Sequence, residues 1–102
     1  MTVAGFEWDE GNRRKCRKHG VSREEIEAMF QQPLSVFPDP AHSPYEERFK
    51  AIGKSQEGRN ILIVFTIRQR QKSHLIRPIS ARYMHRKEVE HYEKEIPRSQ
   101  KR

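Results

Sequence analysis

The segment from Asn60 to Ile67 constrains the fold most, because it is the only long apolar run in the chain. Its β-branched and aromatic residues favour a strand at the centre of a sheet. Successive side chains of a strand point to opposite faces, so the run has two faces. One face holds Ile61, Ile63, Phe65 and Ile67, and the other holds Leu62, Val64, Thr66 and Arg68. We expect helices to cover the first face and the second, more polar face to stay open for a ligand.

Two short helices before this strand are predicted by their capping residues. Asp9 offers a side-chain oxygen to the start of the first helix, and Gly20 suits the left-handed residue that ends it. Ser22 and Glu25 have the spacing of a capping box at the start of the second helix, and Pro33 stops that helix. The first helix has few apolar residues, so we expect its packing on neighbours to stabilise it. In the second helix Ile26, Met29 and Phe30 fall on one face at helical spacing.

Further extended segments complete the sheet. A short strand is expected at residues 6–8, and others at 34–37, 45–52 and 73–81. The proline-rich stretch 38–44 lacks the amides for strand pairing and is expected to be a loop. Pro78 cannot donate to a ladder either, so it predicts a bulge or an exposed edge in the last strand.

A final helix is expected at residues 85–96, with Val89, Tyr92 and Ile96 along one stripe and Pro97 at its end. The element order predicts an α+β fold, a small antiparallel sheet with two N-terminal helices and one C-terminal helix packed on it. With 102 residues, the chain is expected to form a single domain over residues 1–102. About residues 6–96 would be ordered, followed by a basic tail at 97–102.

The charge distribution favours a polyanionic partner. The net charge is +7, and the mean hydropathy of −1.04 predicts a thin core under a hydrated surface. No acidic residue lies between Glu57 and Glu88, so the positive charge is regional. The eight basic residues in that segment are Arg59, Arg68, Arg70, Lys72, Arg77, Arg82, Arg86 and Lys87.

Several classes of site find no support in the sequence. Cys16 is the only cysteine, which excludes an internal disulfide and a thiolate metal site and fits a reducing compartment. The histidines are scattered and no glycine-rich phosphate loop is present, so we expect neither a metal nor a cofactor. No apolar run reaches the roughly 18 residues of a membrane span, and no signal pattern is visible, so a cytoplasmic protein without a membrane partner is expected.

RNA cleavage requires none of those sites, because the ribose 2′-hydroxyl can be the nucleophile. Arg68 and Arg82 are the strongest candidates to bind the phosphate, and Arg48 can join them. Each arginine has an alternative role as a solvated charge. His19 is a candidate general acid or base, with the alternative that it only favours the dipole at a helix end. Tyr92 can reach the substrate or can belong to the core.

Five short motifs, taken together, resemble the BrnT-type toxins of bacterial type II toxin-antitoxin pairs. The resemblance extends from Phe6 to about Glu95. The motifs are Phe6-Glu7-Trp8-Asp9, Lys18-His19-Gly20-Val21, Glu47-Arg48-Phe49 with Ile52-Gly53, Thr66 to Arg68, and Ile79-Ser80-Ala81-Arg82. Three stretches depart from the family pattern: Ile67 and Gln69 around Arg68, Pro78, and Tyr83-Met84-His85 after Arg82.

The resemblance implies a RelE-like fold and a metal-independent endoribonuclease that arrests translation. It also implies a BrnA-like antitoxin with a ribbon-helix-helix domain, so that operator DNA is bound only through the antitoxin. The implied catalytic residues are Arg68, Arg82, His19, Arg48 and Glu47, of which His19 or Glu47 would transfer the proton. The expected RNA-binding residues are Lys18, Arg77 and Tyr92. Two alternatives stay open: a non-catalytic module that binds nucleic acid through phosphate contacts, and a basic surface that only docks an acidic partner chain.

Overall fold

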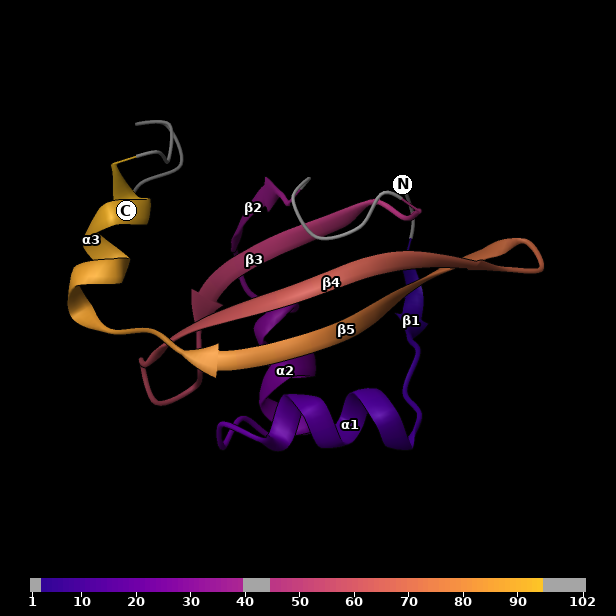
Figure 1. Ribbon diagram of the computed structural model, residues 1–102, viewed down its shortest axis with the longest axis horizontal. Helices are drawn as coiled ribbons and strands as arrows, with labels where there is room; N and C mark the ends of the chain where they lie inside the picture. Colours follow the sequence, from indigo (N-terminus) through magenta and orange to yellow (C-terminus); the bar gives the residue numbers. More distant parts are fainter. Residues whose placement is uncertain (1–2, 40–44, 95–102) are drawn as a thin grey trace.

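Eight helices and strands occur in the computed structural model of the protein, which describes residues 3–39 and 45–94. They are β1 (Val3–Phe6), α1 (Glu10–Arg17), α2 (Arg23–Met29), β2 (Ser35–Pro38), β3 (Arg48–Lys54), β4 (Asn60–Arg70), β5 (Ser73–Tyr83) and α3 (Arg86–Glu93). This content confirms the predicted α+β class (Figure 1). Residues 40–44 of the expected loop, Ile96, Pro97 and the expected basic tail at 97–102 lie outside the described residues.

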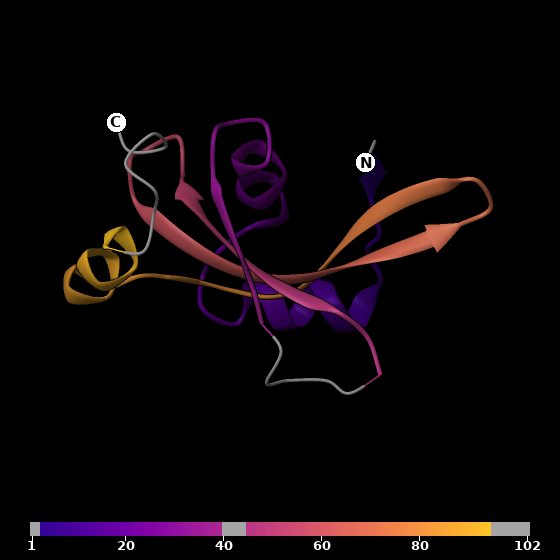
Figure 2. The same ribbon diagram turned by 90° about the horizontal axis from the view of Figure 1, so that it is seen from above.

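The five strands form one sheet in the order β1-β5-β4-β3-β2, which places β4 at its centre as predicted. Strands β2 to β5 are antiparallel neighbours, as expected, but β1 pairs with β5 in parallel. No hairpin joins β1 to β5, because the helices and the other strands intervene, so the turn geometry that imposes antiparallel pairing does not apply. Strand β4 is longer than the apolar run that predicted it, because its backbone pairing with β5 continues to Arg70 opposite Ser73. The tip of the β4–β5 hairpin therefore projects past the other elements (Figures 1 and 2).

Helices α1 and α2 cover one face of the sheet, as the alternation in β4 predicted. Ile61 and Ile63 are fully buried and Phe65 is nearly so, and they pack with residues of both helices. The core residues from the helices are Cys16 of α1 and Ile26 and Met29 of α2, and Val21, between the two helices, joins them. Burying these side chains supplies the main driving force for a chain with so few apolar residues.

The predicted caps are present at both helices. The Asp9 carboxylate accepts a hydrogen bond from the Asn12 amide, and the Ser22 hydroxyl oxygen accepts one from the Glu25 amide. In return the Asn12 and Glu25 side chains accept hydrogen bonds from the cap amides. Gly20 has φ +87°, a conformation that residues with a Cβ rarely adopt.

Pro78 lies at a β-bulge, as predicted. The ladder steps from Val64 opposite Ser80 to Phe65 opposite Pro78, which leaves Ile79 unpaired. The Asn12 amide group donates to the Pro78 carbonyl at 2.8 Å and replaces strand pairing at this point. One extra residue reverses the side-chain alternation, so Pro78 faces the helices and Arg77 faces the other side of the sheet.

Helix α3 lies beyond the ends of β4 and β5, away from α1 and α2 (Figures 1 and 2). It is attached by side chains rather than by a buried stripe, since none of its residues is buried. The Tyr92 ring packs on Phe37 with 5.6 Å between ring centroids, and Val89 is half-buried. No helix in the ranges 3–39 and 45–94 is long and apolar enough to cross a membrane.

Candidate functional site

The face of the sheet opposite α1 and α2 carries basic side chains from three adjacent strands. The register places Arg48, Thr66 and Arg77 in one row, Lys50, Val64 and Ser80 in the next, and Leu62 and Arg82 at the end. Arg68 continues the same face beyond Thr66. We call this surface, as far as Arg68 along β4, the open face; its five cations are Arg48, Lys50, Arg68, Arg77 and Arg82.

Arg48 and Arg68 meet at the carboxylate of Glu46, and these three residues form the Glu46 cluster. The Arg68 Nη2 to Glu46 Oε2 distance is 3.2 Å, and the Arg48 Nε to Glu46 Oε1 distance is 3.8 Å. The Nε–H groups of both arginines are buried and have no hydrogen-bond acceptor within the described residues. A buried donor without an acceptor is costly, so these groups favour a further oxygen ligand at this position.

The second cluster on the open face contains Arg82, Lys50, Glu88 and Tyr92, and we call it the Arg82 cluster. Arg82 forms a two-pronged ion pair with Glu88, with 2.7 Å between Nη1 and Oε1. The hydrogen bonds of this pair raise the pKa of Arg82 and lower the pKa of Glu88. Lys50 Nζ lies 3.4 Å from the Tyr92 hydroxyl oxygen and 6.0 Å from the centre of its ring.

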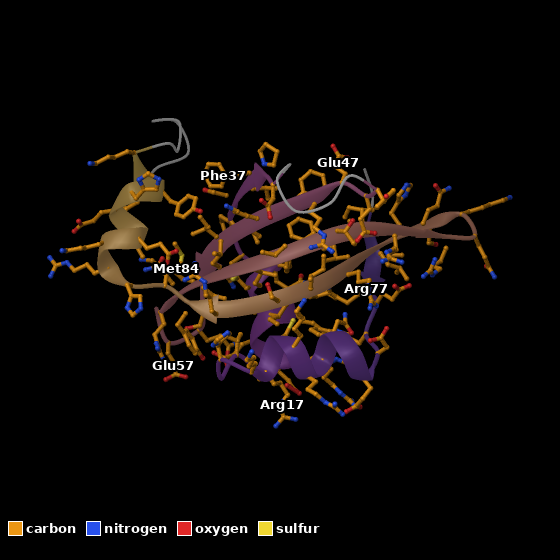
Figure 3. All side chains as sticks on the ribbon, in the orientation of Figure 1. Arg17, Phe37, Glu47, Glu57, Arg77 and Met84 are labelled. Carbon is orange, nitrogen blue, oxygen red and sulfur yellow. The ribbon has the colours of Figure 1, made fainter. Side chains whose placement is uncertain are left out.

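Arg77 is already engaged by two carboxylates of the chain. Its guanidinium lies 3.3 Å from Glu7 and 2.9 Å from Asp9, and Arg70 approaches the same Glu7 carboxylate at 2.8 Å. The pKa of Asp9 is lowered by the Asn12 backbone amide and then by Arg77. Arg77 therefore ties β5 to the end of β1 and to the first turn of α1, and Figure 3 shows it at that edge of the sheet.

The expectation that Arg68 and Arg82 share one phosphate pocket is not met. Arg68 is opposite Leu75, whereas Arg82 is opposite Leu62, six residues away along β4. At about 3.3 Å per residue, the two positions are about 20 Å apart. The structure brings Arg48 and Arg68 together, and it places Arg82 in a separate cluster because the ladder continues well beyond Ile67.

Two residues expected to transfer protons do not lie in either cluster. The Glu47 side chain is exposed, and it is the Glu47 backbone carbonyl that accepts a 2.6 Å hydrogen bond from Thr66. His19, with Lys18, is exposed in the turn after α1, next to Gly20. A Cβ at Gly20 would lie 3.9 Å from the ring of Tyr83, which points to the helix side of the sheet and donates to Glu25 of α2. His19 is therefore separated from the open face by the sheet itself.

Sequence analysis missed Glu46 and Lys50 as candidate residues. Glu46 comes just before β3, where no alternation of apolar and polar residues indicates which way a side chain points. Only the contact with Arg68 in the folded chain distinguishes Glu46 from Glu47. Lys50 had a usable signal, because it lies two residues after Arg48 in the same strand and so shares its face.

Other parts of the described chain offer weaker chemistry. A groove of about 360 Å³ lies between α3 and the turn before β4, but Glu90 and Glu93 line it together with Arg59 and Arg86, so its lining has no excess of positive charge to attract a phosphate. Burial raises the pKa of the Cys16 thiol to about 11, which keeps it protonated and unreactive near neutral pH. Within residues 3–39 and 45–94, no three His, Cys, Asp or Glu side chains are grouped as metal ligands.

Comparison with known protein families gives the class of the molecule. Residues 8–88 match the family described as the ribonuclease toxin BrnT of type II toxin-antitoxin systems. The chain belongs to the BrnT family. Among curated proteins there is no match to it. The matched region of this BrnT protein runs from Trp8 to Glu88, so it contains the whole Glu46 cluster and the Arg82–Glu88 pair, whereas Tyr92 lies beyond it.

Family membership gives this BrnT protein an RNA substrate and an antitoxin partner. The open face carries guanidinium groups, which bind phosphate oxygens in pairs. A BrnT toxin also needs a surface that its antitoxin can cover.

Proposed function

We propose that this BrnT protein is a metal-independent endoribonuclease that cleaves a single RNA strand on its open face. The observation that carries the proposal is the Glu46 cluster, in which two arginines with unmet buried Nε–H donors flank one carboxylate. In the reaction, the ribose 2′-oxygen attacks the adjacent phosphorus and the bond from phosphorus to the 5′-oxygen breaks. The departing 5′-oxygen takes up a proton from the solvent, which balances the proton lost by the 2′-hydroxyl. The products are a 2′,3′-cyclic phosphate and a 5′-hydroxyl, and no water or metal ion is consumed.

Each member of the Glu46 cluster has a role in this reaction. Arg48 and Arg68 bind the non-bridging phosphate oxygens and stabilise the negative charge that develops on them. Glu46 accepts the proton of the 2′-hydroxyl as a general base, the role that sequence analysis gave to Glu47 or His19. The 3.2 Å contact of Glu46 with Arg68 supports this role, because it keeps the carboxylate beside the phosphate-binding groups.

The Arg82 cluster binds the same RNA strand away from the scissile bond. Leu62, opposite Arg82, lies four residues along β4 from Thr66, which is opposite Arg48, so the two clusters are about 13 Å apart along the strand. This distance supports contact of Arg82 and Lys50 with a phosphate beyond the one that is cleaved. Tyr92, packed on Phe37, presents an aromatic ring on which a base can stack.

The antitoxin of this protein is proposed to be a BrnA-like protein with a ribbon-helix-helix domain, through which the pair would contact operator DNA. Acidic residues of the antitoxin would replace Glu46 and Glu88 on the same arginines, so that RNA and antitoxin compete for the open face. Free toxin would then cleave RNA in the cytoplasm and arrest translation.

Mapping of RNA ends tests this function. The purified chain is incubated with RNA in the presence of EDTA, and wild type is compared with Arg68→Lys and with Arg70→Lys, which lies on the same strand. We expect cleavage with 2′,3′-cyclic phosphate ends for wild type and Arg70→Lys, and strongly reduced cleavage for Arg68→Lys. RNA that is bound but stays intact would instead identify a non-catalytic binding module, and RNA that is neither bound nor cut would favour the partner-docking alternative.

A further inference from the structure

The outer surface of α1 is strongly basic and lies apart from the open face. Asn12 and Cys16 are the only buried residues of this helix, and the positions between and after them are exposed. We define the α1 outer face by its five basic side chains, Arg13, Arg14, Lys15, Arg17 and Lys18. Figure 3 shows Arg17 pointing away from the sheet on the outer side of α1.

Carboxylates of the chain neutralise only part of this charge. Glu10 pairs with Arg13 at 2.6 Å and with Arg14 at 3.4 Å. Lys15, Arg17 and Lys18 make no hydrogen bond or ion pair with any residue in the described part of the chain. The positive charges of these three side chains therefore face the solvent without a partner in the described part of the chain.

Helix stability alone does not account for so many cations. One or two positive charges in the last turn favour the helix dipole. Further like charges at i,i+4, as in Arg13 with Arg17 and Arg14 with Lys18, repel one another and destabilise a helix that buries only two side chains. Such an arrangement fits a surface whose charges are neutralised by a bound polyanion.

We propose that the α1 outer face is a second binding surface for the RNA backbone, outside the cleavage site. RNA is favoured over a protein partner because this surface offers no apolar side chain for the core of a protein interface. Backbone binding requires only phosphate contacts, and successive turns of the helix place cations about 5.4 Å apart along it. The assignment of the α1 outer face depends on the proposed function in one respect, namely that the substrate is RNA.

The two surfaces adjoin at β5. Helix α1 packs against β5, and Asp9, which caps α1, contacts Arg77 on the open face. An RNA strand that leaves the open face across the β5 edge would therefore meet α1 next. A short RNA would occupy the open face alone, whereas a long one would contact both surfaces.

The test compares two variants that lose the same charge. In the first variant Arg14, Lys15 and Arg17 are changed to Gln, which keeps a good helix propensity. In the control Lys54 of β3, Lys72 of the turn after β4 and Lys87 of α3, all exposed, are changed to Gln. Binding of a long RNA is measured against salt concentration, and cleavage is measured on the long RNA and on a tetranucleotide. For the α1 variant we expect the salt slope to fall by about 2, at about 0.7 per phosphate contact. KM for the long RNA should rise about tenfold, with kcat on the tetranucleotide unchanged.

The outcomes separate this proposal from the proposed function. A salt slope and a long-RNA KM that match those of the control, in a variant with an unchanged melting temperature, would overturn the α1 surface. The same would follow if the variant bound the antitoxin more weakly while RNA binding stayed unchanged, since that result identifies a protein interface. If wild type did not cut the tetranucleotide or the long RNA, the proposed function would fail, while the salt slope would still decide the α1 surface.

Discussion

The two clusters of the open face contain similar side chains but are built in different ways. In the Glu46 cluster, Arg48 and Arg68 come from adjacent strands whose positions are held by the backbone ladder. In the Arg82 cluster, Glu88 and Tyr92 come from α3, which has no buried residue. The two arginines of the first cluster depend on the sheet alone, and Glu46 lies two residues before β3. The second cluster exists only while α3 stays docked.

This difference indicates how the work is divided between the clusters. Catalysis requires groups held close to their productive geometry, which the ladder provides for Arg48 and Arg68. Binding of a remote phosphate tolerates looser placement, which suits side chains that α3 brings to Arg82. We therefore expect changes in the Glu46 cluster to lower kcat, and changes in the Arg82 cluster to raise KM.

The largest effect is expected for Glu46→Gln, which keeps the shape of the side chain and removes the proton acceptor. Loss of a general base costs about 10²- to 10⁴-fold in kcat. Glu47→Gln is the matched control, since Glu47 is the adjacent residue, is exposed, and contributes only its backbone carbonyl to Thr66. Steady-state cleavage of a short RNA measures both. Equal rates for the two variants would show that Glu46 is not the base.

Arg68→Lys is expected to lower kcat by about 10²-fold, because an ammonium group supplies charge without the two parallel donors of a guanidinium. RNA affinity should change much less. The Arg70→Lys control lies on the same strand, at an exposed ion pair with Glu7. If Arg68→Lys cut RNA as fast as the control, the Glu46 cluster would be a binding site and not the catalytic one.

The sequence allowed the fold to be predicted largely from local signals. The alternation in β4, the caps at Asp9 and Ser22 and the bulge at Pro78 all depend on neighbouring residues. The parallel pairing of β1 with β5 depends on which sheet edge stays free after the other strands have paired, and no local pattern carries that information.

The site was only partly predictable for the same reason. Arg48 and Arg68 were identified as candidates, but the length of the ladder that separates Arg68 from Arg82 was not. Simple alternation along β5 would place Arg77 and Arg82 on opposite faces, since they are five residues apart. The unpaired Ile79 brings both to the open face, and the place of a bulge depends on the partner strand.

A smaller effect is expected when Arg82 and Glu88 are both changed to Gln. The double variant avoids leaving either partially buried charge unpaired. KM for RNA should rise about tenfold with little change in kcat, because a remote phosphate contact is made equally in the ground and transition states. Arg86→Gln, at the exposed start of α3, is the control and should match wild type. A large fall in kcat with KM unchanged would place the Arg82 cluster at the scissile bond.

The smallest effect concerns the attachment of α3 at low pH. The Arg82 hydrogen bonds hold the pKa of Glu88 below its ordinary value near 4.5, so the pair stabilises the folded chain above that pH. The contribution disappears as the pH falls through the lower, folded pKa. Because both side chains are partly exposed, less than about 1 kcal/mol is at stake. NMR shifts of the Phe37 and Tyr92 rings should report detachment of α3 as the pH falls below 4.5, while the shifts of core residues such as Ile63 stay unchanged. In Glu88→Gln the ring shifts should be independent of pH over this range, and a transition identical to wild type would show that another group controls the docking of α3.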